Sequence, residues 1–184
     1  LAEYVLGCHA AGVPIAGICG GYQMLGRELR DPAGIESTTP FMRGLCLLDV
    51  VTTFEPAKTT AQVRAVHLEF QAPIRAYEIH MGRTVRGASC RPVFTVIERS
   101  REPVEHLDGA SSEDGSVWGT YLHGLFDAPL FRRRILNRLR QQRGWTALDP
   151  GALPCVPGQA DSLATLIREH VDLRLLHEIL NAPA

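Results

Sequence analysis

A segment near the start of the chain places three local patterns in direct succession. Residues 13–18 form an apolar run that is typical of a buried strand, and residues 19–21 follow as a tight turn with two glycines. Between residues 22 and 29, apolar side chains recur at the spacing of one helix face. A strand that passes through a short turn into a helix is a building unit of α/β proteins, so we predict an α/β fold.

The rest of the chain alternates between helical and β-rich patterns. Residues 1–11 have helical spacing and end at Gly12, a natural C-terminal stop. A later helix is predicted to begin after Asp127, which can cap it, with Pro129 in its first turn. The predicted strands cover residues 45–54, 61–70, 74–80, 93–97 and 117–122.

Proline and glycine mark the expected domain boundary. Residues 144–160 contain three prolines and three glycines and indicate a linker. We therefore expect a main domain over residues 1–143 and a helical extension over residues 161–184, with one or two amphipathic helices between residues 161 and 180.

Charge, hydropathy and cysteine content exclude several classes of function. The formal net charge is −1, so no global basic field gathers nucleic acid or an anionic membrane, and the arginine-rich face of the helix after Pro129 is interpreted as a solvated surface. No window reaches the roughly 18 apolar residues of a membrane span. The five cysteines include no C-x-x-C pair, which argues against a zinc site or a disulfide framework and favours the reducing cytosol.

Cys19 lies at the turn between the predicted strand and helix. A thiolate at such a turn is stabilised by the helix dipole and by free backbone N–H groups, which makes it a candidate nucleophile. We expect Gly20 and Gly21 to permit unusual backbone angles and to leave room for a substrate carbonyl, and the N–H of Gly20 to donate to an oxyanion. A merely buried structural cysteine is the alternative interpretation.

A thiol nucleophile needs a base, and His123 is the best placed of the seven histidines. It closes the predicted strand 117–122 and precedes Gly124. Strand ends in open α/β sheets border the crevice in which ligands bind, so His123 is predicted to meet Cys19 across that crevice.

These residues carry a resemblance to a known family. The run Gly17-Ile18-Cys19-Gly20-Gly21-Tyr22-Gln23 resembles the G-x-C-x-G-x-Q nucleophile elbow of class I glutamine amidotransferases. This resemblance implies an open, mostly parallel, flavodoxin-like sheet flanked by helices. More narrowly, nearly the whole chain resembles the cobyric acid synthase family. The matching segments are residues 17–26, 31–36, 44–45, 58–60, 77–82, 121–127 and 161–180.

The resemblance implies a glutaminase. Cys19 would attack the side-chain amide of glutamine, ammonia would leave, and water would hydrolyse the γ-glutamyl thioester, with His123 as general base and acid. Gly20 and a glycine loop upstream would hold the oxyanion, and Gln23 would help to hold glutamine. Residues 78–82 correspond to a strand whose end lies over the glutamine pocket in that family, so the resemblance implies that His80 and Met81 contact the substrate. A packed strand is the alternative for that block.

One departure from the family pattern concerns the orientation of the base. Many class I amidotransferases have a glutamate two residues after the histidine, whereas this chain has Leu125. A Cys-His dyad is therefore expected. Asp127 or Glu78 is a candidate orienter of His123, although Asp127 is better explained as a helix cap.

A second departure is the start of the chain, where only 18 residues precede Cys19. The family fold implies further strands, the oxyanion loop and an ATP-dependent, corrinoid-binding synthase domain upstream. We therefore expect an N-terminally truncated piece that holds no cofactor or metal, with ATP and Mg²⁺ used by the absent domain and glutamine and a corrinoid as partners. Because losing one oxyanion donor costs on the order of 100-fold in rate, we expect weak activity from the piece alone.

Three alternative functions remain open at the level of sequence. The chain resembles the sister family of cobyrinic acid a,c-diamide synthases less well at the Tyr-Gln after the elbow and at residues 78–82. An amidotransferase subunit that modifies cell-wall lipid II is a second alternative. A non-catalytic module that kept the fold is the third.

Overall fold

The structure is a computed structural model that describes residues 1–149, 159–175 and 181. It divides into two compact units, Leu1–Pro150 and Gly151–Ala184. Most of the predicted linker, residues 150–158, lies outside the described residues, as does the end of the predicted helical extension, residues 176–180 and 182–184. Within the second unit, helix α4 spans Gln159–His170.

A three-stranded sheet carries the predicted strand–turn–helix segment. Its order is β1 (Ile15–Ile18), β9 (Val117–Thr120) and β8 (Ala110–Ser111). Strands β1 and β9 pair in parallel, from Ile15 opposite Val117 to Ile18 opposite Thr120. The chain leaves β1 through Cys19 and enters helix α2 (Gly20–Leu25). The predicted strand and turn are therefore confirmed.

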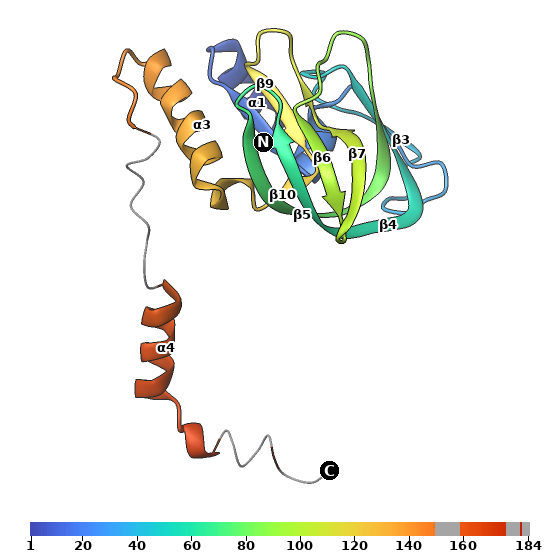
Figure 1. The fold of residues 1–184 in the computed structure, drawn as a ribbon. Coiled ribbons are helices and arrows are strands. Elements are labelled where there is room, and N and C mark those ends of the chain that lie inside the picture. The colour runs from blue at the N-terminus through green and yellow to red at the C-terminus, as the bar shows by residue number, and fades with distance from the viewer. Residues whose placement is uncertain (150–158, 176–180, 182–184) are drawn as a thin grey trace. The chain divides into compact units, whose positions relative to one another are not determined.

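A second sheet, of seven strands, lies in the same unit (Figure 1). The main path is β10-β5-β4-β2-β3, and β6 joins β4 to β7. Among the described strands only β2–β4 and β1–β9 pair in parallel, so the two sheets are mixed rather than mostly parallel. The reason is that short turns join successive strands, as in the β4–β5 hairpin, and short turns produce antiparallel pairs. The bounds are β2 (Glu28–Arg30), β3 (Phe41–Arg43), β4 (Val50–His67), β5 (Ala72–Arg86), β6 (Phe94–Arg99), β7 (Glu102–Asp108) and β10 (Leu122–His123).

Several predicted boundaries were wrong. The helix predicted to reach residue 29 ends at Leu25, and residues 28–30 form strand β2. A Cβ on Gly26, the residue after that helix, would lie 2.8 Å from the backbone oxygen of Val50, so the chain turns there against β4. The strands predicted over 45–54 and 61–70 are parts of one strand, β4, with an irregularity in its register between Thr53 and Lys58.

The first unit begins and ends with a helix in sequence. Helix α1 (Ala2–Ala10) confirms the predicted N-terminal helix, and α3 (Pro129–Gln142) has Pro129 in its first turn as predicted. The predicted cap by Asp127 is wrong, because Asp127 ends the 3-10 helix η1 (Leu125–Asp127) and Ala128 is the N-cap of α3. No helix among the described residues is both long and apolar enough to cross a bilayer.

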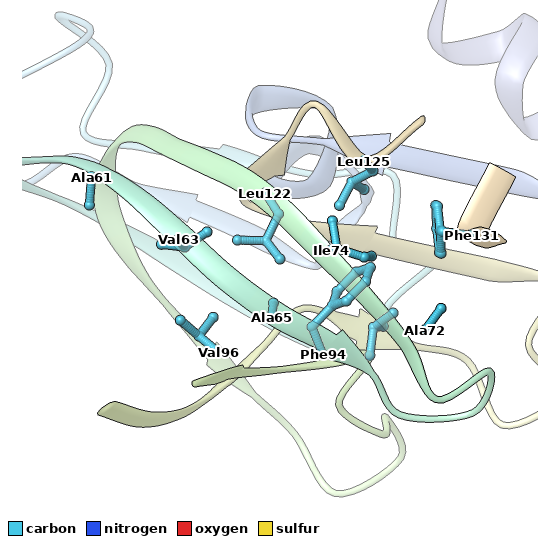
Figure 2. Packing of buried hydrophobic residues seen from close by; sticks show 11 residues of the cluster. Ala61, Val63, Ala65, Ala72, Ile74, Phe94, Val96, Leu122, Leu125 and Phe131 are labelled. Carbon is cyan, nitrogen blue, oxygen red and sulfur yellow. The ribbon is translucent and has the colours of Figure 1, made fainter. Parts of the chain in front are cut away.

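Two separate hydrophobic clusters hold the unit together, and consecutive residues belong to different clusters. Tyr121 packs with residues of α2, β4 and β9, whereas Leu122 packs on the β4–β5 hairpin together with Phe131 of α3. Figure 2 shows the cluster around Leu122. The chain therefore passes from one hydrophobic cluster to the other between Tyr121 and Leu122, immediately before His123.

Candidate active site

Cys19 has a strained backbone. Its φ is 54° and its ψ is −116°, in a region that L-residues avoid at a cost of about 1–3 kcal/mol. Its N–H donates to the carbonyl of Thr120 at 2.9 Å, and its own carbonyl accepts from the N–H of Gln23 at 3.1 Å. These bonds hold the turn from both sides. The prediction that Gly20 and Gly21 adopt the unusual angles was wrong, because neither has a positive φ and the strain lies on Cys19 itself.

Two other glycines allow the elbow to close. A Cβ on Gly17 of β1 would lie 2.6 Å from Cδ1 of Leu25, and a Cβ on Gly119 of β9 would lie 2.3 Å from Cδ2 of Tyr22. Only glycine lets α2 lie this close to both strands. A Cβ on Gly20 or on Gly21 would meet no atom within 4 Å, so open space surrounds the first turn of α2.

The thiol of Cys19 points to strand β5. Its Sγ lies 3.3 Å from the carbonyl oxygen of Ile79, to which it donates, and the residue is half-buried. A half-buried thiol at the end of a strand, beside open space, is accessible to a small substrate.

His123 lies against the same stretch of β5. It pairs with Tyr77 across the β10–β5 ladder, and the two rings stack with centroids 4.9 Å apart and an interplanar angle of 8°. Ile79, whose backbone carbonyl the thiol of Cys19 contacts, lies two residues along β5 from Tyr77. The structure thus brings Cys19 and His123 to neighbouring positions along β5, although they are far apart in sequence.

Stacking, not a carboxylate, holds the ring of His123. Asp127 is exposed, and among the described residues no hydrogen bond or ion pair joins a carboxylate to His123. Glu78 is 1% exposed and pairs with Arg99 at 3.0 Å. Because Glu78 lies opposite Leu122 in the ladder, its side chain is on the other face of β5 from Tyr77. The Nε2 of His123 is buried and makes no hydrogen bond within the described part of the chain.

Gln23 and Met81 lie together and bond each other, whereas the sequence led us to expect that each contacts glutamine. The Nε2 of Gln23 donates to the carbonyl of Met81 at 3.0 Å and to the hydroxyl of Tyr121 at 3.1 Å. Gln23 is buried, and these two bonds tie α2 to β5 and to the segment before His123. Its amide nitrogen is therefore already occupied.

Tyr121 is a site residue that the sequence did not reveal. Its ring stacks on His80 with centroids 3.7 Å apart, and its hydroxyl bonds Thr84 as well as Gln23. Burial lowers the pKa of His80. No local pattern distinguishes Tyr121 from any other aromatic strand residue, because its contacts come from segments 37 and 98 positions away.

Metal ligands do not gather in the described part of the chain. No three or more His, Cys, Asp or Glu side chains there are placed to hold a metal ion. Cys8, Cys19, Cys46 and Cys90 are free thiols.

The chain is similar to known proteins over most of its length. Residues 1–131 match the model of the CobB/CobQ-like glutamine amidotransferase domain. The cobyric acid synthase of Limosilactobacillus reuteri (strain DSM 20016) is 44% identical over 98% of this chain and 36% of its own length, and that of Alkaliphilus metalliredigens is 38% identical over 100% and 39%. The chain thus spans somewhat more than a third of these relatives.

A solved structure supports the fold. A chain in the structure of PurLQS from Thermotoga maritima superposes with a TM-score of 0.53 at 21% sequence identity, and the match covers 75% of this chain and 68% of that one. At this identity the likeness concerns the fold alone. The fold, the elbow at Cys19 and the match over residues 1–131 agree, and the chain belongs to the family of CobB/CobQ-like glutamine amidotransferase domains.

Proposed function

We propose that the chain is the glutaminase part of a cobyric acid synthase and that Cys19 and His123 perform the hydrolysis. The observation that carries the proposal is the placement of both side chains against Tyr77 and Ile79 of β5. The similar proteins are named cobyric acid synthases, which favours this enzyme class over the sister synthases and over the enzymes that modify lipid II. The strain on Cys19 favours a catalytic over a structural thiol, because such strain concentrates at functional sites.

The reaction would proceed in two steps. The sulfur of Cys19 attacks Cδ of the glutamine side chain, and His123 takes the thiol proton and passes it to the departing nitrogen, so that ammonia leaves. Water, deprotonated by His123, then attacks the γ-glutamyl thioester, which releases glutamate and returns the proton to sulfur. The N–H of Gly20, at the open start of α2, would donate to the oxyanion in both steps.

The other predicted site residues take more indirect roles in this proposal. Gln23 would position the elbow rather than bind glutamine, because both of its Nε2 contacts are made inside the protein. Met81 would act through its carbonyl, which holds Gln23. His80 would border the site as a neutral ring, because burial lowers its pKa and Tyr121 covers one of its faces.

The remaining partners follow from the longer relatives. ATP-dependent amidation of adenosylcobyrinic acid a,c-diamide would take place in the part of those proteins that this chain does not span, and ATP and Mg²⁺ would bind there. The free thiols of the four cysteines that the structure describes support a location in the cytosol.

Covalent labelling tests the nucleophile directly. The glutamine analogue 6-diazo-5-oxo-L-norleucine is expected to add once, at Cys19, as read by peptide mass spectrometry, and glutamine is expected to protect. Cys46 is a matched control because it is exposed and also has a positive φ, of 56°. The variant Cys46→Ser should label like the parent and Cys19→Ser should not. Labelling that persists in Cys19→Ser would overturn the proposal.

The acceptor is tested separately, in a protein that also contains a synthase part. With glutamine labelled with ¹⁵N in its amide group, ATP and adenosylcobyrinic acid a,c-diamide, the proposal expects ¹⁵N in the corrinoid amides. Cys19→Ala should abolish the transfer from glutamine and retain the amidation that uses free ammonium. Labelled lipid II in place of labelled corrinoid would favour the other substrate class.

A further inference from the structure

The chain changes sheets at Tyr121. Thr120 ends β9 in the three-stranded sheet, and Leu122 begins β10 in the seven-stranded sheet. At such a crossing the backbone N–H groups leave one ladder before they enter the next, and a buried N–H without an acceptor is costly. The acceptors at this crossing come from side chains.

Asp108, the last residue of β7, supplies one of them and holds the residue that supplies the other. Its Oδ2 accepts from the hydroxyl of Thr120, and its Oδ1 accepts from the N–H of Tyr121 at 3.4 Å. The Thr120 hydroxyl in turn accepts from the N–H of Leu122 at 3.1 Å. Asp108 and Thr120 together therefore satisfy two successive N–H groups of the crossing.

No residue in the described part of the chain pairs with the Asp108 carboxylate as a counter-ion. Asp108 is 4% exposed and Thr120 is fully buried. Burying an acid group without a cation is unfavourable, so its retention points to a geometric task that needs two acceptor atoms at one place.

The held segment connects both proposed catalytic residues. The carbonyl of Thr120 accepts from the N–H of Cys19 at 2.9 Å, which fixes the elbow to the end of β9. Three residues after Thr120, His123 pairs with Tyr77 of β5. A shift of residues 120–122 would therefore move His123 relative to Cys19.

We propose that Asp108 is a positioning residue that holds Cys19 and His123 in their mutual geometry through Thr120 and the backbone of Tyr121. This inference rests on the proposed glutaminase function. A carboxylate suits the task because the Thr120 hydroxyl and the N–H of Tyr121 both donate to it. In Asp108→Asn the shape is kept, but the amide NH₂ either faces the N–H of Tyr121, which it repels, or faces the Thr120 hydroxyl, which must then accept instead of donating.

The test compares substitutions that break this contact with substitutions that keep it. Asp108→Asn and Thr120→Val remove one partner each, whereas Thr120→Ser retains the hydroxyl. Asp114→Asn is the matched control, because Asp114 likewise accepts from a serine hydroxyl and a backbone N–H, but in an exposed turn. Each variant is first shown to be folded by its circular dichroism and thermal transition.

Two readouts separate positioning from stability. A misplacement of about 1 Å can cost about 100-fold in rate, so kcat for glutamine hydrolysis is expected to fall about 10- to 100-fold in Asp108→Asn and Thr120→Val, with KM little changed. The second readout is the pH profile of Cys19 alkylation by iodoacetamide, with Cys46 in the same sample as internal reference. In both variants this profile should move towards that of His123→Ala, while Thr120→Ser and Asp114→Asn keep the parental profile.

The outcomes distinguish this inference from the function on which it rests. A folded Asp108→Asn with parental kcat and a parental alkylation profile overturns the inference. If Asp108→Asn does not fold, the Thr120 pair decides, and equal profiles for Thr120→Val and Thr120→Ser overturn it. If the parent and His123→Ala already share one profile, the proposed pairing of Cys19 with His123 fails, whatever Asp108 does.

Discussion

Gly17 and Gly119 lie directly opposite each other on the parallel strands β1 and β9, and both are covered by helix α2. A methyl group on Gly17 would meet Leu25 and the backbone of Gly21, and one on Gly119 would meet the ring of Tyr22. The pair forms a flat platform under the helix that follows Cys19. Helix α2, which follows Cys19, can therefore lie this close to the sheet only because neither position carries a side chain.

We predict that Gly119→Ala destabilises the protein by about 1–3 kcal/mol, which is the usual cost of overpacking a core. Tyr22 is 2% exposed, and Cδ2 of its ring would lie 2.3 Å from the added methyl group. The free energy of unfolding in urea measures the effect. Glutaminase activity should fall as well, because a displaced α2 moves Cys19.

Gly7→Ala is the matched control for this prediction. Gly7 lies in α1, and a Cβ there would meet no atom within 4 Å. Alanine is favoured over glycine in a helix by about 1 kcal/mol, so this variant should be as stable as the parent or more stable. Equal stability of Gly119→Ala and Gly7→Ala would contradict the platform.

The strain on Cys19 predicts an unusual order of stability. At φ 54° a glycine is unstrained whereas an alanine is not, so Cys19→Gly should be more stable than Cys19→Ala by about 1 kcal/mol or more. Both variants should be inactive. Chemical denaturation of the two variants measures the difference.

The order should reverse at Cys8, which lies within helix α1. There Cys8→Gly is expected to be less stable than Cys8→Ala, because glycine lowers helix stability. If Cys19→Gly were also the less stable of its pair, the backbone at the elbow would be relaxed in solution. Backbone strain would then no longer support the interpretation of Cys19 as a catalytic thiol.

The sequence predicted the elbow because that signal is local. An apolar run, two glycines and a helical period stand next to one another, and the strand, the turn and Cys19 at the N-cap follow from residues 13–25 alone. Which residue bears the strain was not predictable in the same way. Glycines commonly take positive φ, yet here Cys19 does, because bonds from Thr120 and Gln23 hold it there.

Features that depend on pairing between distant segments could not be predicted from the sequence. The mixed character of the sheets results from the long β4–β5 hairpin, whose register includes an irregularity after Thr53. The crossing at Tyr121 also has no local signature, because residues 117–122 resemble one continuous strand in sequence but belong to two sheets. Asp108 was overlooked for the same reason, since its partners follow it by 12 and 13 positions.

The orientation of His123 by stacking leads to a third prediction. An aromatic pair contributes about 0.5–1.5 kcal/mol, so Tyr77→Ala is expected to lower kcat for glutamine hydrolysis up to about 10-fold, while Tyr77→Phe keeps the ring and the activity. Steady-state kinetics with glutamine measure both variants.

Asp127→Ala serves as the comparison for Tyr77→Ala. Asp127 is exposed and does not cap α3, so its loss should change stability by less than about 0.5 kcal/mol and leave kcat unchanged. A large loss of kcat in Asp127→Ala with none in Tyr77→Ala would instead indicate that a carboxylate orients the base.

A buried histidine outside the site predicts how stability depends on pH. His67 is 6% exposed and stacks on Phe70, and burial lowers its pKa from 6.5 to about 4. Between pH 4 and pH 6.5 His67 binds a proton in the unfolded chain but not in the folded protein. The contribution of His67 is therefore fully present above pH 6.5 and is lost as the pH falls towards 4, by about 3 kcal/mol in total.

Asp108 acts in the opposite sense, so the parent's pH dependence alone does not isolate His67. Burial raises the pKa of Asp108 from 3.8 to about 6, and its contribution is lost as the pH rises through that range. The comparison of variants separates the two groups. In urea unfolding between pH 7.5 and 4, His67→Gln should lose about 3 kcal/mol less than the parent, because glutamine does not titrate. His106→Gln, at an exposed histidine, is the matched control and should follow the parent. If His67→Gln and the parent have parallel curves, His67 is protonated in the folded protein and its ring is not isolated from water.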